Sequence, residues 1–136
     1  MILVDSNIII DIIGGDPAWS DWSNAQLAKA LQTDGLAINP IIYAELCAHE
    51  QTGRHLDAFL TAGNIAVQAL STTCARLAGM AFLQYRKNKG AKSGVLADFF
   101  IGAHAQEMQW TILTRDVGRY QTYFPTVKLI TPKETP

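Results

Sequence analysis

The opening of the chain constrains the fold more than any other stretch. Residues 1–4 form an uninterrupted apolar run, and Asp5 follows it directly. A run of this kind is typical of a strand buried on both faces, as in a parallel sheet. Ser6 or Asn7 can then cap a helix that carries five isoleucines and ends at a Gly-Gly pair. Asp5 is therefore expected at the carboxyl end of a central strand, where open α/β sheets hold their ligands.

Length and composition indicate one globular domain. The chain has 136 residues, 49% of them hydrophobic and 17% charged, which is enough apolar mass for a core. No apolar run is long enough to cross a membrane, and residues 1–4 lack the basic leader of a signal peptide. Cys47 and Cys74 form no motif, and we expect them to be reduced core residues of a cytoplasmic protein.

Apolar runs of strand length alternate with helical patterns along the whole chain. After the first strand, we expect strands at 36–38, 65–70, 110–113 and 127–130. After the first helix, we expect helices at 17–32, 40–47, 54–62, 71–87, 95–108 and 117–123. The alternation predicts an α/β fold, a three-layer α/β/α sandwich with a mainly parallel central sheet. No repeat or long linker divides residues 1–136, so we expect a single domain.

Asp98 is the strongest single signal of a functional site. It is the only charged residue between Val95 and Ala103, in an otherwise apolar helical stretch. A lone buried carboxylate costs several kcal/mol unless it is paired or bound to a metal. The structural alternative is an acid near the helix start, favoured by the helix dipole or paired with a nearby Lys or Arg.

Two further acids are predicted to reach the same edge of the sheet. Asp116 follows the strand at 110–113, and Glu45 lies in the helix after the second strand. Taken alone, Asp116 could be a helix N-cap and Glu45 a solvated carboxylate. With Asp5 and Asp98, however, they would converge and repel one another, and Mg²⁺ or Mn²⁺ would relieve that repulsion. Such a cluster suits metal-assisted hydrolysis of phosphodiester bonds.

The sequence resembles PIN-domain proteins, and among them the VapC-type toxin ribonucleases. Four short motifs carry the resemblance in the family's order and span nearly the whole chain: Val4-Asp5-Ser6-Asn7, Tyr43-Ala44-Glu45-Leu46, residues 96–105 (LADFFIGAHA) and residues 112–116 (ILTRD). The resemblance implies that Asp5, Glu45, Asp98 and Asp116 hold the metal, with Asn7 and Thr114 supporting the carboxylates. It also implies a homodimer, an RNA substrate and a cognate antitoxin. Gly102 and His104 depart from the alanine-rich helix usual in the family, which bears on packing.

The net charge of −1 excludes a general electrostatic attraction to RNA but leaves room for a local basic patch. Residues 86–92 form such a run, in which Arg86, Lys87, Lys89 and Lys92 are predicted to bind RNA, together with Arg115. The structural alternative for the run is a solvated loop after a helix.

Two other functional classes stay open. A haloacid-dehalogenase-like phosphatase also begins with an acid at a strand end, but it needs a second Asp where this chain has Asn7. A catalytically inert α/β interaction domain is the other alternative. His49, His55 and His104 lack the spacing of a zinc site, and no glycine-rich phosphate loop is present.

Overall fold

A computed structural model describes residues 1–33, 35–90 and 95–132 of the chain. Strands and helices alternate in it as predicted. In chain order the elements are β1 (Ile2–Val4), α1 (Ser6–Gly14), α2 (Ser20–Ala30), β2 (Leu36–Ile38), α3 (Pro40–Cys47), α4 (Glu50–Ala62), β3 (Ile65–Val67), α5 (Thr72–Lys87), α6 (Leu96–Met108), β4 (Thr111–Leu113), α7 (Gly118–Tyr123) and β5 (Leu129–Ile130).

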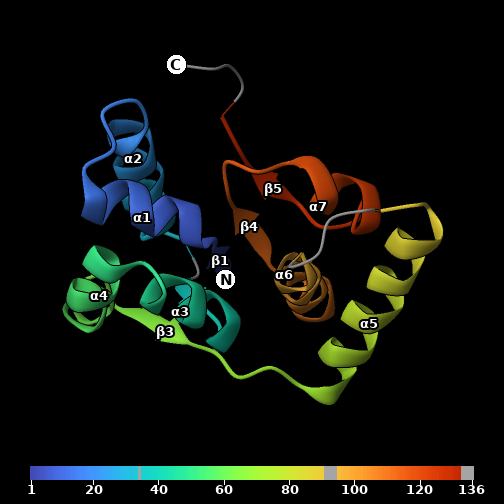
Figure 1. The fold of residues 1–136 in the computed structure, drawn as a ribbon. Coiled ribbons are helices and arrows are strands. Elements are labelled where there is room, and N and C mark those ends of the chain that lie inside the picture. Colours follow the sequence, from blue (N-terminus) through green and yellow to red (C-terminus); the bar gives the residue numbers. More distant parts are fainter. Residues whose placement is uncertain (34, 91–94, 133–136) are drawn as a thin grey trace.

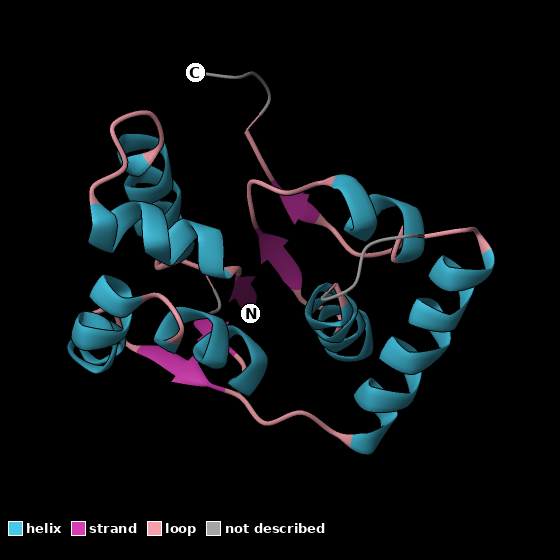
Figure 2. Ribbon diagram, in the orientation of Figure 1, coloured by secondary structure: helices cyan, strands magenta, loops and turns pink. Residues whose placement is uncertain are grey.

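The strands form one parallel sheet in the order β3-β2-β1-β4-β5 (Figure 2). β1 is the central strand, and its three residues are all buried. Its last residue, Val4, pairs with Leu113, the last residue of β4. The residues that follow β1 and β4 therefore leave the sheet side by side, at its carboxyl edge.

Helices cover both faces of the sheet. In Figure 1, α1 to α4 lie on one side of the central strands, and α5 to α7 lie on the other. This division follows from right-handed crossovers, because the chain moves outward from β1 to β3 and then returns to β4 on the opposite side. The predicted three-layer α/β/α sandwich is confirmed, with a sheet that is parallel throughout the described residues.

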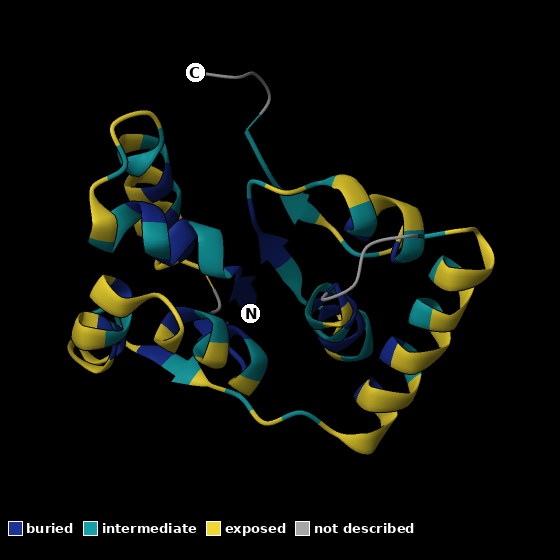
Figure 3. Ribbon diagram, in the orientation of Figure 1, coloured by how far each residue is buried: buried dark blue, intermediate teal, exposed yellow. Residues whose placement is uncertain are grey.

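The core lies between the sheet and the helices that cover it, where buried residues gather in Figure 3. Cys74 is buried there as expected, but Cys47 is exposed, so the prediction that both cysteines are core residues was wrong for Cys47. Cys47 is the last residue of α3, and its side chain lies at the exposed carboxyl end of that helix. Within the part of the chain that the structure describes, no helix combines the length and apolarity needed to cross a bilayer.

Several boundaries differ from the sequence prediction: the helix predicted at 17–32 spans Ser20–Ala30, and the strand predicted at 127–130 begins at Leu129. Two differences have a clear structural reason. The strand predicted at 65–70 ends at Val67, because the chain must leave the sheet edge to reach α5 on the other face. The helix predicted at 54–62 begins four residues earlier, at Glu50. Gly53 lies in this added first turn and allows close packing, because a Cβ at this position would lie 3.0 Å from the carbonyl oxygen of Cys47.

Candidate active site

Asp5 lies at the carboxyl end of β1, and its carboxylate is the N-cap of α1. One oxygen, Oδ1, accepts a hydrogen bond from the backbone N–H of Ser6 at 2.8 Å. The other, Oδ2, accepts from the hydroxyls of Thr114 (2.7 Å) and Tyr120 (3.0 Å). The side chain that caps the helix is therefore that of Asp5, and the expectation that Ser6 or Asn7 would do so was wrong. Burial raises the pKa of Asp5 despite these three donors.

Glu45 reaches the same edge from α3. That helix starts at Pro40, capped by the Asn39 side chain, which accepts from the N–H of Ile42 at 2.9 Å. The Oε1 atom of Glu45 is buried and has no hydrogen-bond partner in the described part of the chain. Burial raises the pKa of Glu45 to about 7, and the negative charge of Asp5 adds to this rise. A freely solvated helix carboxylate, the alternative from sequence, does not fit this burial.

Asp98 lies in the first turn of α6, on the other side of the sheet from Glu45. Its side chain is 25% exposed, and its Oδ2 is 3.4 Å from the Nε atom of Arg119. Burial raises the pKa of Asp98 to about 6 against the opposing effect of Arg119, and the charges of Asp5 and Asp116 raise it further. The structural alternative for Asp98, an ion pair with a nearby Arg, is thus present in the structure. Asp98 also interacts electrostatically with Asp5 and Asp116.

Asp116 forms the exposed rim of the cluster. Its backbone N–H donates to Thr114 Oγ1 at 3.0 Å, and its charge raises the pKa of both Asp5 and Asp98. It is not the cap of α7: the residue before that helix is Val117, and no side chain caps it.

The two predicted supporting residues join β1 to β4. Thr114 Oγ1 donates to Asp5 and accepts from the Nδ2 of Asn7 at 3.2 Å. The Oδ1 of Asn7 in turn accepts from the backbone N–H of Arg115 at 3.2 Å. Each polar atom of Thr114 and Asn7 is thereby used to hold Asp5 and the segment after β4 in a fixed relation.

The four acids therefore meet as one coupled group of charges, with Asp5 at its centre. In the described ranges, no three His, Cys, Asp or Glu side chains lie close enough to form a single preformed coordination sphere. A smaller number of carboxylates is what Mg²⁺ needs, because it keeps several water ligands of its own. The carboxylate donors, the unpartnered Oε1 of Glu45 and the mutual repulsion all fit a hard divalent cation.

Sequence reasoning missed Tyr120 and Arg119, which α7 places against the cluster. Tyr120 is almost fully buried and donates to Asp5, and burial together with the nearby carboxylates raises its pKa well above the ordinary value. No charge or spacing distinguishes these two residues in the sequence. Their role depends on how α7 packs, since the side chain of Phe124 just beyond it fits against Gly102 of α6.

Sequence reasoning also missed an ion pair next to the site. Arg115 donates through Nε and Nη2 to the two oxygens of Asp11, at 2.8 and 2.9 Å. Asp11 is 1% exposed and accepts a further bond from the Ser23 hydroxyl at 2.7 Å. The guanidinium lies 4.7 Å from the centre of the Trp19 ring. Arg115, predicted to bind RNA, thus has its bidentate donors occupied within the protein.

The basic run lies at the end of α5. Arg86, Lys87 and Lys89 are exposed, and Lys92 lies outside the described residues. This end of α5 touches α7, since the Nδ2 of Asn88 donates to the Tyr123 hydroxyl at 3.3 Å (Figure 1). Exposed cations thus border the helix that carries Arg119 and Tyr120.

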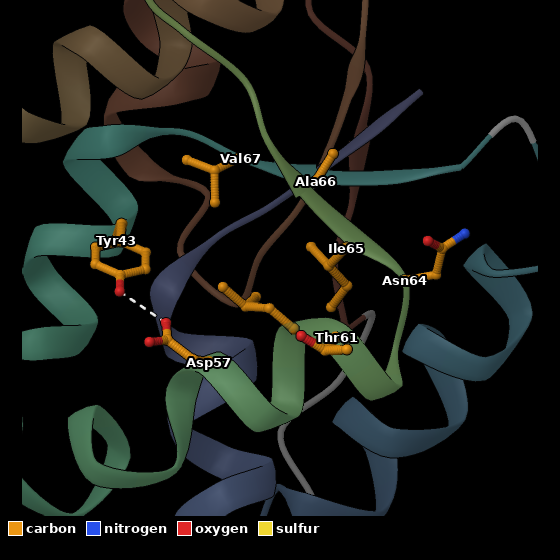
Figure 4. A pocket seen from close by; sticks show the side chains of 8 residues that line it. Tyr43, Asp57, Thr61, Asn64, Ile65, Ala66 and Val67 are labelled. Carbon is orange, nitrogen blue, oxygen red and sulfur yellow. Dashed lines mark hydrogen bonds between the residues drawn. The ribbon is translucent and has the colours of Figure 1, made fainter.

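A separate hollow of about 390 Å³ lies beside the edge strand β3. Figure 4 shows Asp57 and Tyr43 on its wall, where the Tyr43 hydroxyl donates to Asp57 Oδ1 at 2.7 Å. None of the four predicted acids lines it, so this hollow is distinct from the acidic cluster.

The acidic cluster lies at the carboxyl edge of a covered parallel sheet, so the chain is an α/β protein with a charged candidate active site. The chain belongs to the PIN domain family, whose model matches residues 2–125. It is 29% identical over 123 residues to Ribonuclease VapC10 of Mycobacterium tuberculosis, a match that covers 90% of this chain and 88% of that relative.

Solved structures of similar fold include VapBC2 of Rickettsia felis bound to a DNA fragment from its promoter, with a TM-score of 0.75 at 22% identity. That match covers 96% of this chain and 98% of the other. DNA-bound VapBC of Salmonella typhimurium gives a TM-score of 0.72 at 16% identity, covering 96% of each chain. At these identities the likeness establishes the fold.

Proposed function

We propose that this protein is a VapC-type endoribonuclease that cleaves RNA phosphodiester bonds with Mg²⁺ or Mn²⁺, and that it is the cytoplasmic toxin of a toxin–antitoxin pair. The observation that carries the proposal is the coupling of Glu45 and Asp98 to the buried carboxylate of Asp5. A protein keeps such mutually repelling acids together where a cation and a phosphate are to be bound. Membership of the PIN family and the VapC10 relative agree with this function.

In this proposal, Asp5, Glu45, Asp98 and Asp116 hold the ion. When bound, Mg²⁺ or Mn²⁺ supplies a water of lowered pKa and neutralises charge on the phosphate. Hydrolysis adds water to phosphorus and breaks the bond to the leaving ribose oxygen, so the attacking water gives one proton to solvent and the leaving oxygen takes one up from solvent. The Oε1 of Glu45 makes no hydrogen bond within the described residues, so it is available to the ion. Thr114 and Tyr120 hold Asp5 still through this step.

A cleavage assay with purified protein, mixed RNA and Mn²⁺ tests the proposal, with Asp98→Asn as the control variant. Cleavage by the natural chain that Asp98→Asn reduces by orders of magnitude supports it. Hydrolysis of small phosphoesters without RNA cleavage would favour the phosphatase alternative. Absence of both would favour an inert interaction domain.

We further propose that the chain forms a homodimer and is restrained by a small antitoxin. Exposed apolar side chains on α5, Met80 at 62% and Leu83 at 53%, offer a surface for such an apolar partner segment. An Arg or Lys of the partner would be drawn to the acidic cluster, where it would compete with metal and phosphate together. Several structural relatives are themselves toxin–antitoxin complexes. Growth arrest by this chain, relieved by a neighbouring small protein and dependent on that protein's basic residue, is the expected result of co-expression.

A further inference from the structure

Arg119 and Arg115 flank the acidic cluster, but they are bound to the protein in different ways. Arg115 makes two short hydrogen bonds to Asp11, whose side chain is 2% exposed. Arg119 makes one loose contact to Asp98 at 3.4 Å, and both side chains are about a quarter exposed. Arg115 is therefore fixed as a structural group, whereas the terminal Nη atoms of Arg119 make no hydrogen bond to any residue that the structure describes.

The Nε atom of Arg119 is buried and faces Asp98 Oδ2 at 3.4 Å without forming a hydrogen bond, so within the described part of the chain this charged donor is not satisfied. Leaving a charged donor without a partner is unfavourable, so an acceptor is expected to complete it. The aromatic ring of Tyr85 lies 5.9 Å from the guanidinium carbon and helps to hold its plane beside the cluster. The aliphatic part of the Arg119 side chain is thus positioned by the protein, while the terminal Nη atoms can still donate hydrogen bonds to a ligand.

The chemistry of that acceptor follows from the surroundings. A carboxylate ligand would add negative charge to four acids that already repel each other. A phosphodiester must enter this field to be hydrolysed, and a guanidinium matches two of its oxygens in one planar contact. Arg119 also lies on α7, which the exposed basic end of α5 touches through Asn88 and Tyr123, so the basic run and Arg119 are on neighbouring helices.

We propose that Arg119 is a catalytic residue that binds a phosphate of the RNA at the acidic cluster, held ready there by its loose contact with Asp98. This inference rests on the proposed ribonuclease function. The guanidinium donates two hydrogen bonds to non-bridging oxygens of the phosphate, and it offsets negative charge as the bond to the leaving oxygen breaks. Arg119 thus supplies a positive charge for the phosphate, which Arg115 cannot do because its guanidinium is bound to Asp11.

The test measures binding of a labelled single-stranded RNA in EDTA, where turnover is not supported, at several salt concentrations. Arg119→Gln is expected to weaken binding by about tenfold. It should also flatten the slope of log affinity against log salt by about 0.7. Arg119→Lys keeps the charge and should retain most of the slope while losing part of the affinity. Arg54→Gln is the matched control, because it removes the same charge from an exposed pair with Glu50 on α4.

A second measurement separates this role from a purely structural one. Thermal melts should show all three variants folded, since the contact of Arg119 is loose and partly exposed. Unchanged RNA affinity and salt slope in Arg119→Gln, with tighter Mn²⁺ binding, would mean that Arg119 only neutralises Asp98, and would overturn the inference. If the natural chain cleaves RNA and this result is found, the proposed function stands without Arg119. If the natural chain neither binds nor cleaves RNA, the proposed function fails first, and the inference fails with it.

Discussion

The hydroxyl of Thr114 donates a hydrogen bond of 2.7 Å to Asp5, a residue 109 positions earlier in the chain. The bond is short because β1 and β4 are neighbours in parallel register, with Val4 opposite Leu113. It links the first acid of the proposed site to the segment that carries the last acid, Asp116. The site is thus built across the middle of the sheet, and its properties depend on contacts between distant parts of the chain.

The metal-free protein is expected to become less stable as the pH rises from about 4 to about 7. The pKa of Asp98 is raised from 3.8 to about 6 in the folded state, and that of Glu45 from 4.5 to about 7. A carboxyl group with a raised pKa in the folded state ionises more easily in the unfolded chain. Its contribution to the free energy of unfolding is therefore complete below the pKa of the unfolded state and is lost as the pH rises to the pKa of the folded state. Urea unfolding in EDTA across this range measures it, and the double variant Glu45→Gln/Asp98→Asn should show a much smaller change.

Mn²⁺ affinity is expected to rise over the same pH range. Glu45 and Asp98 must lose their protons before they can bind a cation, and their pKa values of about 7 and about 6 place that loss between about pH 5.5 and about pH 8. Calorimetric titration in two buffers of different ionisation enthalpy measures both the affinity and the protons released. An affinity that does not change with pH would contradict the assignment of these two acids.

Removing the charge of Asp98 is expected to separate activity from stability. Asp98→Asn keeps the shape of the side chain but removes a proposed metal ligand, so RNA cleavage should fall by orders of magnitude. The same change removes one of the repelling charges, so the metal-free protein should melt at the same or a slightly higher temperature. Undiminished metal-dependent cleavage by the variant would disprove the site.

The Asp11–Arg115 pair is expected to matter for stability far more than an exposed pair does. Asp11→Asn leaves the guanidinium without its bidentate partner and should cost about 2 kcal/mol, somewhat reduced because Arg115 is 27% exposed. Glu50→Gln, which breaks the exposed pair with Arg54, is the control and should cost less than about 0.5 kcal/mol. If urea unfolding gives the same loss of free energy of unfolding for both variants, the buried pair stabilises the fold no more than the exposed pair does.

Neutralising the exposed basic end of α5 is expected to weaken RNA binding. Lys87→Gln combined with Lys89→Asn removes two charges, and Asn suits position 89, where φ is 62°. For single-stranded RNA, the salt slope should fall by about 0.7 for every phosphate that the variant no longer binds. The matched control changes Lys29 and Lys128 on other parts of the molecule. If the two double variants behave alike, the run is a solvated loop, as its structural alternative states.

The sequence predicted the layers and the four acids, but not the contacts that position them. The apolar run before Asp5 was enough to predict a central strand, because few other structures bury such a run on both faces. Asp11, in contrast, was not singled out in the sequence, and Arg115, 104 residues away, was predicted to bind RNA. Their pairing depends on the strand order, which brings the end of β4 next to α1. The same is true of Tyr120, whose contact with Asp5 requires α7 to fold back over β4.

Gly102 shows how one packing detail fixes α7. A Cβ at this position would lie 2.3 Å from the buried ring of Phe124, so the absence of a side chain lets α7 approach α6. In the sequence, Gly102 stands out only as a departure from alanine, and the reason for it becomes visible once α6 and α7 are packed together.

The parallel pairing of β1 with β4 also determines when the proposed active site can form. β1 leaves the ribosome long before its partner, which ends at Leu113, and Asp116 follows only then. Loop closure over so long a separation is slow compared with the formation of local helices. A growing chain that still lacks β4 has no Thr114 to hold Asp5 and no α7 to bring Tyr120. Synthesis through α7 therefore precedes assembly of the acidic cluster, so under the proposed function the metal site cannot form before residue 123 has been made.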